Sequence, residues 1–191
     1  MANKFREESP KRVFKGSYKN YRDYKPHLAK DFLNRCGYTN CFDFWFGGAG
    51  TFHIDHFIPW KSYPQRPELK TDYQNLIYCC SFVNILKSND EGNYLDPCNV
   101  DLNEHFFRDS KGNIMPSSKS VKAQYMHKKL KLYLIRYRLI WLLDQVNHKI
   151  SLLQERLDKT KEPEKRTELL VAAGELGLEM NRYINYLKKN Q

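Results

Sequence analysis

Two long segments in the C-terminal part of the chain carry apolar residues at alternating steps of four and three. In residues 119–158 these positions are Leu139, Leu143, Val146, Ile150, Leu153 and Leu157. In residues 164–188 they are Leu169, Ala173, Leu176, Met180, Tyr183 and Leu187. Such a heptad seam marks one apolar face of a helix, and Pro163 separates the two segments. The pattern predicts two helices that form an antiparallel hairpin, although a coiled-coil contact with another chain gives the same spacing.

A strand pattern lies nearer the N-terminus. Residues 42–46 are aromatic and favour a strand, and the glycine-rich residues 47–50 favour a turn. In residues 51–56 apolar and polar positions alternate, as in a strand with one buried face. We therefore expect strand, turn and strand, with Asp55 and His56 at the end of the second strand.

Shorter elements complete the prediction. Residues 28–33 fit a short helix, Asp72 fits the N-cap of a helical turn that carries Asn75, and residues 80–87 fit a helix. Residues 104–115 contain a turn between two short extended runs and fit a β-hairpin. Together with the C-terminal helices, these elements predict an α+β fold.

The chain has 191 residues, which suits one compact domain or a small domain with a helical appendage. We expect three parts: a basic N-terminal arm with a short helix in residues 1–35, a core with the added hairpin in residues 36–117, and a two-helix extension in residues 118–191. The aromatic content of 14% indicates a packed globule.

The charge balance suggests a class of partner. The chain has 32 Lys and Arg against 22 Asp and Glu, a net charge of +10. Such a surface attracts nucleic acid, although a well-solvated basic surface needs no partner. The first ten residues are polar and charged, and no apolar run approaches the ~20 residues of a membrane span. We therefore expect a cytoplasmic protein with no membrane partner.

Basic residues and tyrosines alternate in the N-terminal arm, where Tyr18, Tyr21 and Tyr24 are spaced three apart. This composition suits contact with a nucleic-acid backbone and stacking on bases. The alternative is that the tyrosines pack on the domain. The candidate nucleic-acid contacts are Lys15, Lys19, Arg22, Lys61 and Lys87.

Asp55, His56 and Asn84 form the candidate chemical site. Carboxylate and amide oxygens are hard ligands that suit Mg²⁺ or Mn²⁺. The histidine titrates near neutrality and can take a proton from water. Asn84 and Lys87 are three residues apart, so both side chains lie on one face of the expected helix.

The order of these residues resembles the HNH (ββα-metal) endonuclease superfamily. The matching positions are His53, Asp55, His56, Pro59, Asn75, Leu76, Cys80, Asn84 and Lys87. The resemblance implies a ββα-metal core that hydrolyses DNA phosphodiester bonds. It assigns His56 as general base, Asn75 as the brace of the loop that orients it, and Lys87 as a phosphate contact. One divalent ion would bind Asp55 and Asn84, and His53 would be a further ligand or a group that fixes the site.

The cysteines depart from this family pattern. Their odd number, five, does not suggest a disulfide framework. Many relatives hold a structural zinc ion with two Cys-x-x-Cys pairs, but here four residues separate Cys36 from Cys41, and Tyr38 stands where one partner is expected. We therefore do not expect structural zinc at Cys36, Cys41 and Cys80. The aromatic cluster around residues 42–46 is a candidate replacement.

A looser similarity extends to about residue 115. The segments 95–97, 103–106 and 109–112 are similar to elements that follow the HNH core in a subgroup linked to retrons and Septu-type phage defence. This similarity implies the nuclease effector of an antiviral complex, with an ATPase partner bound through the C-terminal helices; a homodimer is the other option. The alternative function is a catalytically silent nucleic-acid-binding or assembly subunit that retains the HNH fold.

Overall fold

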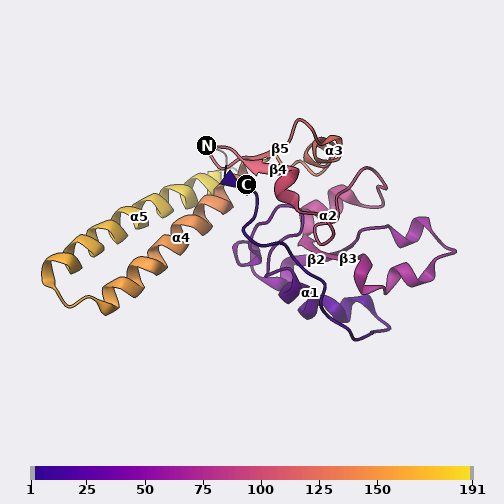
Figure 1. The fold of residues 1–191 in the computed structure, drawn as a ribbon, viewed down its shortest axis with the longest axis horizontal. Helices are drawn as coiled ribbons and strands as arrows, with labels where there is room; N and C mark the ends of the chain where they lie inside the picture. Colours follow the sequence, from indigo (N-terminus) through magenta and orange to yellow (C-terminus); the bar gives the residue numbers. More distant parts are fainter. Residues whose placement is uncertain (1–2, 190–191) are drawn as a thin grey trace. The chain divides into compact units, whose positions relative to one another are not determined.

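The computed structural model describes residues 3–189 and has a mixed α+β fold (Figure 1). The chain forms two compact units, one that ends at Tyr137 and one that begins at Arg138. The α-helices are α1 (Lys25–Asp31), α2 (Ser81–Lys87), α3 (Val121–Lys129), α4 (Ile135–Lys159) and α5 (Pro163–Lys189). The strands are β1 (Asn3–Lys4), β2 (Phe52–His56), β3 (Leu76–Cys80), β4 (Phe106–Arg108) and β5 (Ile114–Pro116).

The first unit contains two small antiparallel sheets. One has the strand order β1-β4-β5, and the other consists of β2 and β3. In the second sheet Asp55 pairs with Ile77, and His56 pairs with Leu76. Because α2 begins directly after β3, this sheet and helix form a ββα unit that places the end of β2 beside α2.

The strand expected at residues 42–46 is wrong, because Asp43–Phe46 is a 3₁₀ helix. The helix ends at Gly47, which adopts a left-handed φ of 95°, and Tyr78 donates a 2.6 Å hydrogen bond to the Asp43 carboxylate. The strand that pairs with β2 is β3, which follows it in the chain. All five residues of β3 are buried, so the strand lacks the alternation that reveals one-sided strands.

The expected hairpin at residues 104–115 is confirmed by β4 and β5. The single helix expected over residues 119–158 is wrong, since α3 ends before α4 begins. Lys131 has a φ of 50°, and the Leu132 amide donates to the His127 carbonyl oxygen at 2.9 Å. This is a Schellman-type helix end, and it leaves α3 in the first unit, beyond the boundary expected at residue 117.

The N-terminal segment is joined to the rest of the first unit by side-chain hydrogen bonds. Arg6 donates to the Gly37 carbonyl oxygen at 2.8 Å, and Arg12 donates to the Leu76 carbonyl oxygen at 2.9 Å. Arg12 also forms a buried ion pair with Asp96 at 3.0 Å. These contacts tie residues before α1 to the core and bring the following segment to the end of β2.

The second unit is a helical hairpin, as the apolar seam predicted (Figure 1). Arg166 closes the connection between the helices, where it donates to the carbonyl oxygens of Leu157 and Thr160 at 2.7 and 2.8 Å. The seam positions Ile150, Leu153, Leu157, Leu169, Ala173, Leu176, Met180, Tyr183 and Leu187 are half-buried. Within residues 3–189, no helix has both the length and the apolar character that crossing a membrane requires.

Candidate functional site

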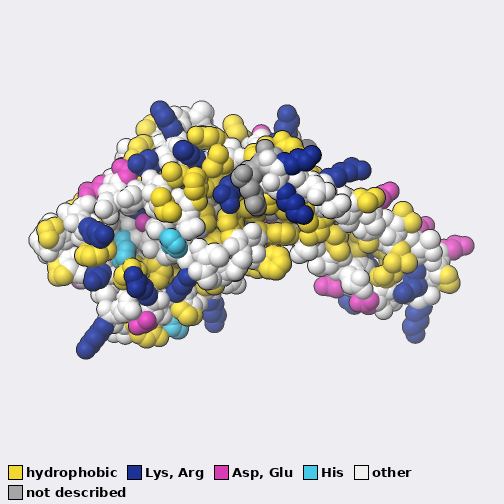
Figure 2. Space-filling view, turned by 180° about the vertical axis from the view of Figure 1, so that it is seen from behind, with side chains coloured by type: hydrophobic (Ala, Val, Ile, Leu, Met, Phe, Trp, Pro, Cys, Tyr) yellow, Lys and Arg dark blue, Asp and Glu magenta, His cyan; other side chains and the backbone are white. Residues whose placement is uncertain are grey.

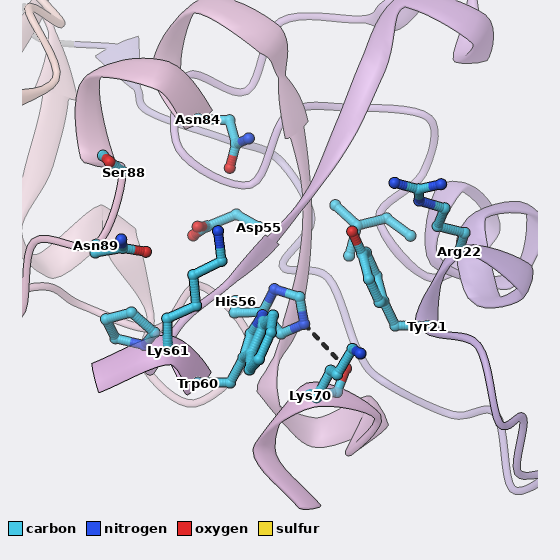
Figure 3. A pocket seen from close by; sticks show the side chains of 12 residues that line it. Tyr21, Arg22, Asp55, His56, Trp60, Lys61, Lys70, Asn84, Ser88 and Asn89 are labelled. Atoms are coloured by element: carbon cyan, nitrogen blue, oxygen red, sulfur yellow. Dashed lines mark hydrogen bonds between the residues drawn. The ribbon is translucent and has the colours of Figure 1, made fainter. Parts of the chain in front are cut away.

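The candidate residues meet at an open cleft between the end of β2 and α2. Asp55 and His56 are the last residues of β2, and Asn84 lies in the middle of α2. The cleft has a volume of about 450 Å³. Figure 3 labels its lining residues Tyr21, Arg22, Asp55, His56, Trp60, Lys61, Lys70, Asn84, Ser88 and Asn89. Lysine and arginine side chains surround exposed histidines on the face drawn in Figure 2.

A backbone carbonyl holds His56 in one tautomer. Its Nε2 lies 3.0 Å from the carbonyl oxygen of Lys70 (Figure 3). Because a carbonyl oxygen can only accept, Nε2 carries the proton and Nδ1 remains the acceptor. Burial lowers the pKa of His56; the Lys70 carbonyl opposes this shift, whereas the charges of Lys87 and Lys70 add to it. A lowered pKa keeps the ring neutral near pH 7, so that Nδ1 can accept a proton.

Asn75 braces the loop that positions His56. Its amide oxygen accepts from the Ile58 amide at 2.8 Å, and its amide nitrogen donates to the carbonyl oxygens of Ile58 and Leu69, both at 2.9 Å. Leu69 immediately precedes Lys70, whose carbonyl oxygen holds the imidazole. Asn75 therefore occupies the bracing position that the motif predicted.

The Asp55 carboxylate is buried between two donors. The Tyr38 hydroxyl donates to Oδ2 at 2.6 Å, and the Lys87 ammonium lies 3.2 Å from each carboxylate oxygen. Burial raises the pKa of Asp55, whereas Lys87 and Tyr38 oppose the rise because they stabilise the ionised form. These contacts fix the orientation of the carboxylate at the wall of the cleft.

Lys87 does not occupy the position that the motif predicted. Its side chain is 0% exposed, and its ammonium group also donates to the carbonyl oxygen of His56 at 2.8 Å. The Lys87 Nζ lies over the Tyr94 ring, 5.3 Å from the ring centroid. Lys87 is therefore an internal counter-ion of Asp55 in this structure, and a phosphate in the cleft would not meet it.

His53 and Asn84 contact each other beside the cleft. The amide nitrogen of Asn84 lies 3.2 Å from Nδ1 of His53. With the nitrogen engaged there, the amide oxygen of Asn84 points towards Asp55 (Figure 3). His53 lines the adjoining pocket together with Tyr21 and Arg22. It is thus placed to orient Asn84, which is one of the two roles that the sequence left open.

The donor set suits a hard divalent cation. Asp55 offers carboxylate oxygens, Asn84 offers an amide oxygen, and the open cleft admits water for the remaining positions. The described residues contain no group of three or more His, Cys, Asp or Glu placed to share a metal ion. An ion at this position would therefore rest on one carboxylate, one amide and solvent, a set that fits Mg²⁺ or Mn²⁺.

The predicted nucleic-acid contacts are divided between the cleft and other surfaces. Arg22 and Lys61 line the cleft and are exposed. Lys15 and Lys19 are also exposed but are not among its lining residues. The N-terminal segment therefore reaches the candidate site through its 3₁₀ helix at Tyr21–Tyr24.

Several residues of the site were not assigned a place in it from the sequence. Lys70 contributes its carbonyl oxygen, which any residue type can offer, so no side chain marks it. Tyr38 replaces an expected cysteine, and that departure was its only signal. Tyr21 and Trp60 line the cleft on either side of His56. Tyr21 belongs to the tyrosine-rich segment that was a candidate for base stacking, although its place beside His56 was not expected, and Trp60 directly follows Pro59.

The five cysteines are free thiols, and four of them are buried. The sulfur atoms of Cys36 and Cys80 are 3.9 Å apart. The Cys41 sulfur lies instead 3.9 Å from the carbonyl oxygens of Thr39 and Tyr137. Phe52 and Tyr78 pack their rings 4.8 Å apart in the same core.

No family model, curated protein or solved structure matches the chain. The functional assignment therefore depends on the geometry of the cleft and on the order of the motif residues.

Proposed function

We propose that the protein is a metal-dependent endonuclease of the HNH type that hydrolyses DNA phosphodiester bonds. The observation that carries this proposal is the tautomer of His56. Its Nε2 donates to the Lys70 carbonyl at 3.0 Å, which leaves Nδ1 as a base in a cleft that also holds Asp55 and Asn84. Hydrolysis of a phosphodiester needs an activated water, and a neutral histidine of this kind can provide it.

The residues in the cleft and those that support them have separate tasks in this mechanism. His56 takes a proton from the attacking water at Nδ1, and the Lys70 carbonyl stabilises the imidazolium that forms because it accepts from Nε2. Asp55 and Asn84 would hold a divalent ion, which would supply charge neutralisation at the phosphate and at the leaving oxygen. Tyr38 and Lys87 keep the Asp55 carboxylate oriented, and Asn75 keeps the loop that carries Lys70 in place.

The wider role is proposed from the similarity of residues 95–112 alone. We infer that the nuclease acts as an effector of a phage-defence complex and that α4 and α5 contact an ATPase partner. The seam residues of these helices pack within the hairpin but stay half-buried, and their exposed parts are compatible with such a contact.

One observation favours the second candidate, a catalytically silent nucleic-acid-binding subunit. Lys87 already neutralises the carboxylate that would bind the metal, at 3.2 Å from both oxygens. If this ion pair persists in the presence of metal, Asp55 has little charge left to bind it, and the cleft would bind DNA without cutting it.

Cleavage of supercoiled plasmid in Mg²⁺ or Mn²⁺ separates the two candidates. Wild-type protein is expected to nick or linearise the plasmid, and His56→Ala is expected to abolish this activity. His148→Ala is the matched control, because His148 is an exposed histidine of α4. Equal cleavage by wild type and His56→Ala would contradict the mechanism. Intact plasmid in every reaction would support the catalytically silent subunit.

A further inference from the structure

Two aromatic side chains from distant parts of the chain flank His56. The ring centroid of Tyr21 lies 4.8 Å from that of His56, and the centroid of Trp60 lies 6.3 Å from it, both edge to face. Tyr21 belongs to the N-terminal segment, whereas Trp60 lies in the loop that follows β2 (Figure 3). Both residues are half-buried and line the cleft, so each ring keeps an accessible part beside the catalytic base.

Exposed cations accompany both rings. The ammonium groups of Lys70 and Lys61 lie 4.9 and 5.9 Å from the Trp60 ring centroid. The Arg22 guanidinium carbon lies 5.9 Å from the centroid of Tyr21. Among the described residues, none of these three cations forms an ion pair with a carboxylate. Their charges are therefore available to an anionic ligand in the cleft.

This combination suits an unpaired strand better than a duplex. Phosphates of either form attract cations, but a duplex covers the faces of its bases by stacking them on their neighbours. An aromatic side chain can stack only on a base whose face is open, and such stacking stabilises a single-stranded complex by about 1–3 kcal/mol per base. The rings on both sides of the His56 imidazole could not stack on a nucleobase if the nucleotides in the cleft stayed stacked in a double helix.

We propose that the cleft binds an unpaired nucleotide next to the scissile phosphate. Trp60 and Tyr21 are its stacking platforms, and Arg22, Lys61 and Lys70 contact the neighbouring phosphates. The protein accordingly prefers single-stranded DNA to duplex DNA. This inference rests on the proposed nuclease function for the identity of the scissile phosphate, but its binding preference can be measured without cleavage.

The test is fluorescence anisotropy with a labelled oligonucleotide, offered as a single strand and as the duplex of the same sequence. The titrations are done in EDTA, so that no cleavage occurs. Wild-type protein is expected to bind the single strand more tightly. Trp60→Leu should weaken binding of the single strand by about tenfold or more, the scale of one lost stacking contact, and should change duplex binding little.

Two further variants identify the cause of that loss. Trp60→Phe keeps an aromatic face and should retain most of the single-strand affinity. Phe44→Leu removes an aromatic residue that is 64% exposed and lies outside the cleft lining, so it should bind as the wild type does. If Trp60→Leu does not fold by circular dichroism, Tyr21→Leu tests the second platform in the same way.

The inference is overturned if the wild type binds the duplex as tightly as the single strand. It is also overturned if Trp60→Leu leaves single-strand affinity unchanged, or lowers both affinities equally. Failure of the nuclease proposal would give a different result. Uncleaved plasmid together with a strong single-strand preference would contradict the nuclease proposal and support the stacking site. Cleaved plasmid without that preference would overturn this inference alone.

Discussion

Lys87 and Asp55 form a buried ion pair whose two members depend on each other. Removing both charges from water is costly, so such a pair adds little net stability when it is intact. Removing one partner is different, because it leaves the other charge buried without compensation. Asp55 keeps its Tyr38 hydrogen bond in that case, but it loses the only cation within contact distance among the described residues.

Substitution of Lys87 should therefore destabilise the fold strongly. We expect Lys87→Met to lower the free energy of unfolding by about 3–5 kcal/mol, measured by urea denaturation. The double variant Asp55→Asn, Lys87→Met should lose less than the sum of the single variants, since it removes both charges. Lys61→Met, at an exposed lysine of the cleft, should stay within about 0.5 kcal/mol of the wild type. A loss below about 1 kcal/mol for Lys87→Met would contradict a structural role for the pair.

The residues of the site that were predictable from the sequence are those whose side-chain chemistry is distinctive. The sequence placed four such residues in one site. The structure brings Asp55, His56 and Asn84 to the cleft, and Asn75 to the loop that carries Lys70. The phosphate contact predicted for Lys87 differs from its place in the structure. A basic residue near a candidate site is equally suited to a phosphate and to a buried carboxylate. Which of the two it meets depends on the depth of the side chain, and spacing along a helix does not reveal depth.

At the scale of elements, the same limit explains the misplaced strand. The aromatic segment 42–46 has high strand propensity, yet Asp43–Phe46 is a 3₁₀ helix, whereas residues 77–79 of β3 were assigned to no element. Strand propensity reflects packing on a half-buried surface more than an intrinsic backbone preference. A short strand buried on both faces carries no alternating pattern, so its pairing partner and not its own sequence defines it.

The break between α3 and α4 also lacked a sequence signal. Glycine usually occupies the left-handed position of a Schellman motif, but here Lys131 adopts it with a φ of 50°. The flanking Leu130 and Leu132 are both 0% exposed. Burial of these two leucines offsets the cost of the lysine conformation, and tertiary packing of that kind is not visible in local sequence.

His127 links α3 to β5 and should make stability depend on pH. Its Nε2 donates to the Ile114 carbonyl oxygen at 2.9 Å. Burial lowers the pKa of His127, and the Ile114 carbonyl opposes the shift only in part. The folded protein therefore binds this proton less readily than the unfolded chain, whose histidines titrate near ~6.5. Stability is unaffected by this group at higher pH and falls as the pH drops below that value.

The corresponding experiment compares urea denaturation between about pH 7 and pH 5, across the titration of an ordinary histidine. His127→Gln keeps a donor for the Ile114 carbonyl but cannot titrate, so its free energy of unfolding should fall less steeply with decreasing pH than that of the wild type. His148→Gln, at an exposed position of α4, should follow the wild type. An unchanged slope in His127→Gln would show that this residue does not contribute to acid sensitivity.

At the scale of the whole molecule, the N-terminal segment shows how one sequence feature serves two purposes. Its basic and aromatic composition left two readings open, nucleic-acid contact or packing on the domain. The structure distributes these roles along the segment: Arg6, Arg12 and Tyr24 are buried, whereas Tyr21 and Arg22 line the cleft. Net charge led us to expect a polyanionic partner, but it could not show which cations line the cleft.

In the proposed mechanism, Nδ1 of His56 takes the proton from the attacking water. Chemical rescue tests it most directly: the cleavage rate of His56→Ala is measured in Mg²⁺ with and without added imidazole. We expect a severe loss of rate, of about 10²-fold or more, that imidazole partly restores. Wild-type cleavage by His56→Ala without imidazole would contradict the claim.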